Sequence, residues 1–142
     1  MLRTVMPAPL VDTLELTLDA DGRAPRLAFV TALWQWHRSE SIGFLAGDEL
    51  VAAAFLYPLP PSRPGEDYRA LAFICAPAAA RHMLAIIRFA RLTFSRLRHD
   101  PNVRICATAR TATGARLAAL IGMCPIGKLG RIQVFEWQGQ NP

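Results

Sequence analysis

The second half of the chain constrains the fold most, because its segments alternate between strand-like and helix-like patterns. Residues 68–75 and 103–109 are short apolar runs typical of strands, and 131–137 mixes apolar and polar positions as a further strand does. Between these runs, 78–98 and 113–121 carry apolar residues at helical spacing. This alternation predicts an α/β fold of the α+β type, with a mixed central sheet and flanking helices.

The first half adds a strand over residues 2–6, two helices and a hairpin. The first helix starts at Pro9, and its apolar positions are Leu10, Val11, Leu14 and Leu18. Leu14, Leu16 and Leu18 also alternate, so a strand over 13–18 is an open alternative. The second helix has Pro25 in its first turn. Its expected apolar side consists of Leu27, Val30, Leu33, Trp34 and His37.

A hairpin of strands 42–46 and 50–57 is indicated by the turn sequence Gly47-Asp48-Glu49 between two apolar runs. Several prolines then follow, which stop the second strand and stiffen a loop ending at Gly65-Glu66-Asp67. No internal repeat or linker divides the chain. We therefore expect one domain over residues 1–142.

The long helix over 78–98 should be amphipathic. Its expected buried face consists of Met83, Ile86, Ile87, Ala90, Phe94 and Leu97. Its opposite side gathers Arg81, Arg88, Arg91, Ser95 and Arg98, which contribute much of the formal charge of +5. A basic surface of this kind suits a nucleic acid, an acidic partner, a phosphorylated cofactor or simple solvation.

Composition limits the class of protein. With 52% hydrophobic and 19% charged residues the chain should form a globular core. No apolar run approaches the length of a membrane helix, and no signal peptide is apparent, so we expect a cytoplasmic location. Cys75, Cys106 and Cys124 are expected to be buried reduced thiols. His37, His82 and His99 lack metal-ligand spacing, so no metal is predicted.

The short helix over 113–121 runs into a distinctive phrase, Leu120-Ile121-Gly122-Met123-Cys124-Pro125-Ile126-Gly127. Glycine at position 122 suits a helix end in the left-handed conformation. This phrase and the order of elements resemble the acyl-CoA-dependent GNAT acetyltransferase superfamily over essentially the whole chain. In that family a leucine, often a tyrosine, a glycine and an aromatic residue precede a short bend, which Pro125-Ile126-Gly127 would form here.

The resemblance implies acetyl-CoA or CoA as cofactor, held at the end of the central strand and the start of the long helix. The cofactor-binding residues implied by it are Ile74, Ala76, Ala80, Arg81, His82, Met83 and Ala85. The family loop there reads Arg or Gln, two residues, Gly, one residue, then Gly or Ala. Aligned on Pro77, these positions are Ala80, Met83 and Ala85, and only Ala85 matches. Arg81 could supply the missing charge from the next position.

The family's catalytic residues find no clear counterparts, so the catalytic residues stay unknown. The usual base is a glutamate on the central strand, whereas Glu66 and Asp67 precede that strand. The usual tyrosine aligns with Ala118, and the usual asparagine with Thr111. Tyr57 and Tyr68 are alternatives to that tyrosine, although packing at strand ends is favoured for both. Cys75 lacks a histidine partner and is expected in the core.

Two functions of different class remain open. The resemblance implies an N-acyltransferase that moves an acyl group from acetyl-CoA to an amine. The alternative is a non-catalytic assembly protein of the GNAT type, as found in phage gene clusters, which would locate it in a virion. Its protein partner or second copy would dock on an apolar rim at Trp34, Trp36 and Trp137. Binding of nucleic acid is less favoured, because the basic stripe lacks stacking aromatics.

Overall fold

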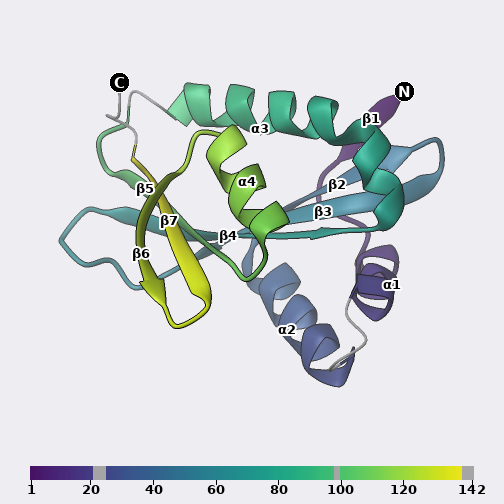
Figure 1. Ribbon diagram of the computed structural model, residues 1–142, viewed down its shortest axis with the longest axis horizontal. Helices are drawn as coiled ribbons and strands as arrows, with labels where there is room; N and C mark the ends of the chain where they lie inside the picture. The colour runs from purple at the N-terminus through teal and green to yellow at the C-terminus, as the bar shows by residue number, and fades with distance from the viewer. Residues whose placement is uncertain (21–24, 98–99, 139–142) are drawn as a thin grey trace. The chain divides into compact units, whose positions relative to one another are not determined.

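The computed structural model describes residues 1–20, 25–97 and 100–138. Within them the chain has an α+β fold with four α-helices and a mixed sheet of seven strands, in the order β1-β2-β3-β4-β5-β7-β6 (Figure 1). The predicted fold class is therefore confirmed. The chain forms two compact units, which are Met1–Tyr57 with Ala72–Met83, and Pro58–Leu71 with Leu84–Pro142. We refer to them as the first and the second unit.

The first unit begins with an antiparallel arrangement of strands. Its elements are β1 (Leu2–Val5), α1 (Leu10–Ala20), α2 (Pro25–Arg38), β2 (Glu40–Ala46), β3 (Glu49–Pro58), the end of β4 (Asp67–Cys75) and the 3-10 helix η1 (Pro77–His82). The β2–β3 hairpin closes through Ala46, which pairs with Glu49. Gly47 in this turn has φ +63, a conformation that glycine adopts without strain. The predicted hairpin is thus confirmed.

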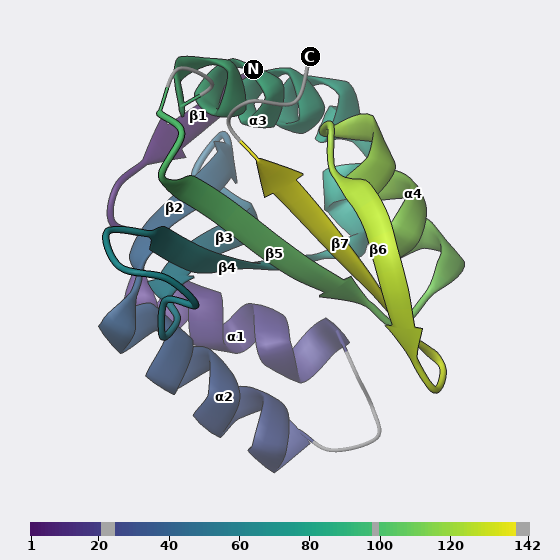
Figure 2. The ribbon, with the colours of Figure 1, turned by 90° about the vertical axis from the view of Figure 1, so that its left-hand side faces the viewer.

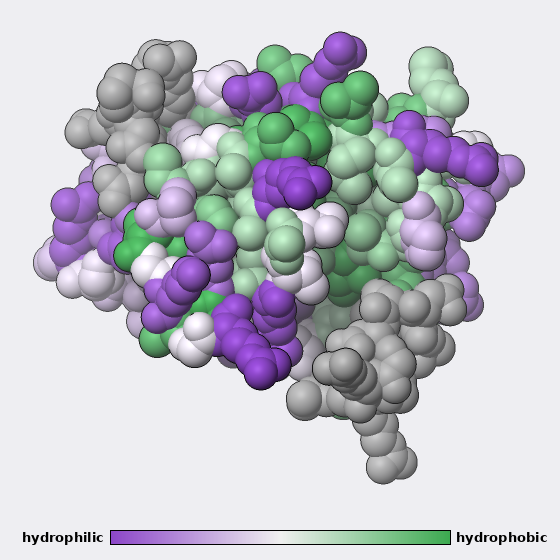
Figure 3. Space-filling view, viewed as in Figure 1, coloured by the Kyte–Doolittle hydropathy of each residue, from purple (hydrophilic) through white to green (hydrophobic). Residues whose placement is uncertain are grey.

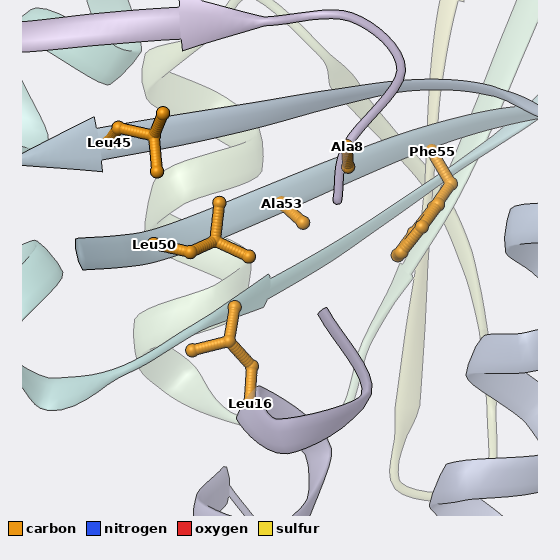
Figure 4. Packing of buried hydrophobic residues seen from close by; sticks show 6 residues of the cluster. All are labelled: Ala8, Leu16, Leu45, Leu50, Ala53 and Phe55. Atoms are coloured by element: carbon orange, nitrogen blue, oxygen red, sulfur yellow. The ribbon is translucent and has the colours of Figure 1, made fainter. Parts of the chain in front are cut away.

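The core of the first unit lies between β2, β3 and α1. Its buried cluster consists of Ala8, Leu16, Leu45, Leu50, Ala53 and Phe55 (Figure 4). Ala72, Ile74 and Ala76 pack against this cluster from β4 and the residue that follows it. Small alanines in the strands leave room for the large Phe55 side chain, which is fully buried.

The segment between β1 and α1 is fixed by side chains that bond the backbone of Ala8. The Ala8 N–H donates to Ser41 Oγ at 3.0 Å, and the indole N–H of Trp36 donates to the Ala8 carbonyl at 2.7 Å. Both polar groups of this buried residue are therefore satisfied. Since Ser41 is on β2 and Trp36 on α2, these bonds tie three elements together.

The second unit combines the start of β4 with the elements of the C-terminal half. These are α3 (Met83–Leu97), β5 (Val103–Ala109), α4 (Ala112–Leu120), β6 (Cys124–Leu129) and β7 (Ile132–Gln138). The start of β4 is parallel to β5, with Asp67 opposite Val103 and Ala70 opposite Cys106. β7 lies between β5 and β6 and is antiparallel to both (Figure 2).

The core of the second unit is formed by α3 and α4 with β5 and β7. Phe94 of α3 packs on Trp137 of β7 with ring centroids 5.2 Å apart. Ile105 on β5 is completely buried, and Ile86, Ile87 and Phe135 are nearly so. The predicted buried face of the long helix is correct for Ile86, Ile87 and Phe94. Because Trp137 is also buried, it cannot belong to an exposed docking rim.

The two N-terminal helices exist, but their buried faces differ from the predicted ones. α1 confirms the helix over the strand alternative, and it buries Thr13 and Leu16 rather than Val11. The expected apolar side of α2 faces outward, with Val30 at 60% and Trp34 at 48% exposure. The helical spacing of apolar residues showed which residues share a face of α2. It did not show which face of the helix is buried. The side chains of Leu18 and Leu27, and residues Arg98 and His99, lie outside the described residues.

Three details of the C-terminal half were not predicted. The long helix begins as a 3-10 turn, so that α3 proper starts only at Met83. Cys124–Leu129 is a strand, although the sequence indicated a bend around Pro125. It is the last strand in the sheet order, where a proline and the bulge between Pro125 and Gly127 are tolerated. Cys124 is exposed rather than buried.

Truncation of Phe55 tests the core of the first unit. We expect Phe55→Ala to lower the free energy of unfolding by about 3–5 kcal/mol, because it removes a fully buried ring and leaves a cavity. Chemical denaturation measures this change. Leu84→Ala is the control, since Leu84 is 74% exposed and its truncation should cost less than about 0.5 kcal/mol. Equal losses in the two variants would contradict the assigned core.

Candidate functional site

The residues predicted to hold a cofactor lie on consecutive elements at the end of β4. Ile74 is on the strand, and Ala76 is the N-cap of η1. Ala80, Arg81 and His82 are in η1, whereas Met83 and Ala85 are in α3. Ala80, Arg81 and Ala85 are exposed, and Ile74, Ala76, His82 and Met83 are partly buried. All of these residues except Ala85 belong to the first unit. There they form one short stretch of the chain, which contains Ile74, Ala76, Ala80, Arg81, His82 and Met83.

The backbone of this segment bonds to itself. The Ala79 N–H donates to the Ala76 carbonyl at 3.0 Å, and the Met83 N–H donates to the Ala80 carbonyl. Pro77 has no N–H to offer. A pyrophosphate site at the start of a helix needs N–H groups that are free to point at the anion. The N–H groups of Ala79 and Met83 are already used inside the turn, and the Ala76 N–H donates to the Val51 carbonyl at 2.8 Å.

The residues of the turn also differ from those of the family's loop. Ala79 is completely buried, and a methionine stands where the resemblance calls for the first glycine. Glycine at such a position lets a backbone approach phosphate oxygens closely, whereas a Cβ and a longer side chain prevent this. The residues present therefore do not fit the family's glycine-containing pyrophosphate loop.

The two carboxylates expected before the central strand differ in place, because Asp67 is the first residue of β4 and only Glu66 precedes it. Glu66 belongs to an ion-pair cluster. Its side chain is 1% exposed and accepts a hydrogen bond from Ser62 Oγ at 3.0 Å. Its carboxylate lies 3.1 Å from Arg63 Nε and 3.2 Å from an Nη of Arg104. Burial alone would raise the pKa of Glu66, but the Ser62 bonds and the two arginine charges hold that pKa below its usual value. A carboxylate held ionised in this way is a poor general base.

The two tyrosines pack within the protein, as expected. Tyr57 meets Trp34 edge to face at 5.7 Å, and the Arg104 guanidinium lies 4.1 Å from the ring centroid of Tyr68. A hydrogen bond with Cys106, together with burial, raises the pKa of Tyr68 despite the opposing charge of Arg104. Tyr68 therefore holds its proton more tightly than a free tyrosine does.

Cys75 ends β4, and its thiol is partly buried. Burial raises the pKa of this thiol, so the nucleophilic thiolate is disfavoured at neutral pH. Within the described residues all three cysteines are free, and no group of three or more His, Cys, Asp or Glu could hold a metal. In that same part of the chain, no helix is long and apolar enough to span a membrane.

The first unit contains an acidic cavity that was not predicted from the sequence. The cavity has a volume of about 560 Å³, within the range of about 300–1,000 Å³ typical of small-molecule sites. Four carboxylates at its rim come from Asp12 and Glu15 on α1 and from Asp48 and Glu49 at the β2–β3 turn. Its apolar lining consists of Leu16, Ala46, Leu50 and Ala76.

Local structure explains how these carboxylates converge. Asp12 and Glu15 are three residues apart, so they lie on one face of α1. The tight turn at Gly47 sets Asp48 and Glu49 at the tip of the hairpin. These two local patterns could be read from the sequence. Their meeting could not, because it depends on α1 packing on the hairpin through Leu16 and Leu50.

Charge is divided unevenly between the units. The first unit holds five Lys and Arg against seven Asp and Glu, a formal charge of −2, whereas the second holds eleven against four, a formal charge of +7. On the face seen in Figure 3, hydrophilic and hydrophobic residues are interleaved. Because the two units differ in formal charge, a site for cations is expected in the first unit and a site for anions in the second.

The comparisons with known proteins show the fold. No protein-family model matches the sequence, and no curated protein matches it significantly. Solved structures do match. The ribosomal-protein-S18-alanine N-acetyltransferase from Escherichia coli has 13% identity and a TM-score of 0.67, over 96% of this chain and 91% of that chain.

Two further solved structures agree. An acetyltransferase of the GNAT family from Bacillus anthracis has 12% identity and a TM-score of 0.64, over 98% of this chain and 96% of that chain. An N-acetyltransferase from Staphylococcus aureus Mu50 has 10% identity and a TM-score of 0.64, over 99% of each chain. At these identities the likeness establishes that the chain has the GNAT fold. None of these likenesses supports a phage origin.

Protonation of Glu66 should weaken the fold. Because its folded pKa is depressed, Glu66 contributes stability above its unfolded pKa, and this contribution is lost as the pH falls through the lower folded pKa. We expect Glu66→Gln to lower the midpoint of thermal unfolding by about 3–10 °C at pH 7 and by less at acidic pH. Calorimetry at both pH values measures this.

The neighbouring carboxylate provides the control. Asp67 pairs with Arg69 at 2.9 Å, but its side chain is 44% exposed. Asp67→Asn should therefore change the midpoint by only about 1–2 °C. A Glu66→Gln variant as stable as the wild type at pH 7 would show that the buried cluster does not support the fold.

Proposed function

We propose that this chain binds a cationic, amine-bearing ligand in the acidic cavity of its first unit. In this proposal the GNAT fold serves as a binding scaffold, without acyl transfer from CoA. The observation that carries the proposal is the cavity of about 560 Å³ with Asp12, Glu15, Asp48 and Glu49 at its rim.

The lining supports an amphipathic ligand with alkyl and ammonium parts. Leu16 and Leu50 are buried and would pack against methylene groups. The exposed carboxylates at the rim would pair with ammonium groups while staying in contact with water. A linear polyamine has this chemistry, and so does a lysine side chain of a partner protein.

The turn after β4, whose N–H groups are bonded within the protein, supports the non-catalytic part of the proposal. The N–H groups of Ala79 and Met83 are bonded within the turn, and no glycine occurs between Gly65 and Gly114. Glu66 is held in its ion-pair cluster, and Tyr68 retains its proton. These N–H groups, this carboxylate and this phenol are therefore engaged in contacts within the protein.

The second candidate is an N-acyltransferase that uses acetyl-CoA and accepts an amine from the same cavity. One observation favours it: Ala76 lines the cavity and is also one of the residues implied to contact the cofactor. The exposed Arg81 lies a few residues further along the chain and carries the positive charge that a pyrophosphate would need. In that case the cavity would present the amine near the end of β4.

Titration with a polyamine tests the cavity. We expect spermidine to bind by isothermal calorimetry and to bind less tightly as salt is added, because exposed ion pairs are screened. Asp48→Asn with Glu49→Gln should weaken binding about 2- to 30-fold, taking about 0.2–1 kcal/mol for each exposed ion pair. Asp100→Asn is a control that removes a charge in the second unit, and it should leave binding unchanged.

Absence of spermidine binding at millimolar concentration would contradict the proposal. So would an equal loss in Asp100→Asn, because that result would mean a general effect of charge rather than a site. Circular dichroism of each variant confirms that the fold is intact before the titrations are compared.

Titration with acetyl-CoA separates the two candidates. The binding proposal expects no heat at millimolar acetyl-CoA and an unchanged melting temperature. Micromolar binding that is weakened about tenfold or more by Arg81→Glu would contradict the binding proposal and favour the acyltransferase candidate. Arg88→Glu is the matched control, because it reverses an exposed charge on α3 outside the predicted cofactor residues.

A further inference from the structure

A second cavity, in the second unit, has the opposite electrostatic character. Its volume is about 190 Å³, and it lies between the end of β5, the start of α4 and the β6–β7 turn. Its charged lining residues are Arg110, Lys128 and Arg131. The remaining lining residues, which include Thr111, Ala115 and Gln133, are uncharged.

The β6–β7 turn brings two of the basic residues to this cavity. Leu129 pairs with Ile132, so that the turn consists of Gly130 and Arg131. Gly130 has φ +61, and glycine allows this tight reversal without strain. Arg131 is therefore in the turn and Lys128 is close to the end of β6, and both line the cavity with Arg110.

The surrounding sequence contains no carboxylate to neutralise these charges. No Asp or Glu occurs between Asp100 and Glu136, whereas Arg104, Arg110, Arg116, Lys128 and Arg131 all fall in that stretch. Arg110, Lys128 and Arg131 are exposed. Among the described residues, the ion pairs involve Arg63, Arg69 and Arg104 but none of these three. Three uncompensated cations on one concave surface attract an anion.

An anion would be attracted by these side chains rather than by the N-terminus of α4. Thr111 Oγ1 already accepts a hydrogen bond from the Gly114 N–H at 3.0 Å and caps the helix. Arginine offers a planar fork of donors that matches phosphoryl oxygens, and lysine adds a mobile point charge. Three cations suit a group with two or more negative charges better than a single carboxylate.

We infer that this cavity binds the phosphoryl group of a small anionic ligand, with Arg110, Lys128 and Arg131 as its cationic contacts. Its volume corresponds to roughly six water molecules of liquid, which suits a phosphate or pyrophosphate group. This site is separate from the acidic cavity of the first unit. It depends neither on the proposed polyamine ligand nor on acyl transfer.

Titration with inorganic pyrophosphate tests the inference. We expect binding by isothermal calorimetry at low salt, with acetate at the same concentration binding at least tenfold more weakly. Lys128→Gln with Arg131→Gln should weaken pyrophosphate binding roughly 5- to 20-fold. Arg91→Gln with Arg96→Gln removes the same charge from exposed positions of α3 and should change binding less than twofold.

Three results would overturn the inference. The first is no pyrophosphate binding at millimolar concentration. The second is an equal loss in the α3 variant, which would mean attraction by the net charge of the unit. The third is a single-stranded oligonucleotide that binds while pyrophosphate does not, which would mean an extended nucleic-acid surface. Melting temperatures of both double variants check that the exposed substitutions leave the fold intact.

Discussion

The two units depend on β4, because this strand contributes a different part of its length to each. Its start pairs with β5 in the second unit, from Asp67 opposite Val103 to Ala70 opposite Cys106. Its end supplies Ala72 and Ile74 to the core of the first unit. Side chains alternate along a strand, so a shift of one residue would disturb both the parallel pairing and this packing. The register of β4 therefore constrains both units.

The carboxylates of the two units have different surroundings. In the second unit, Glu66 is buried and compensated by Arg63 and Arg104, which fixes the proline-rich loop beside β5. In the first unit, the carboxylates around the acidic cavity remain exposed to solvent. A buried ion pair must be complete to be tolerated, whereas exposed like charges are available to a ligand. This difference is why we assign Glu66 to stability and the acidic rim to binding.

Much of the fold could be predicted from the sequence, and much less of the site. The helical spacing in 78–98 and the turn residues at Gly47 gave elements that the structure confirms. β6 was not predicted because Pro125 and Gly127 are unfavourable in a strand, although its pairing with β7 is a local hairpin around Gly130 and Arg131. The cofactor residues implied by the resemblance stay a prediction. The acidic cavity was missed, because its carboxylates come from elements that only tertiary packing brings together.

The sequence by itself determined most of the helices and strands, because the spacing of apolar residues and the turn-forming glycines are local properties. It also determined the absence of a glycine loop after β4. Only the tertiary structure decided which side of each helix is buried. The outward-facing Val30 and Trp34 of α2 show this, since Ala32 and Trp36 face the core instead. Burial and the meeting of charges depend on neighbours distant in the chain, which no local pattern records.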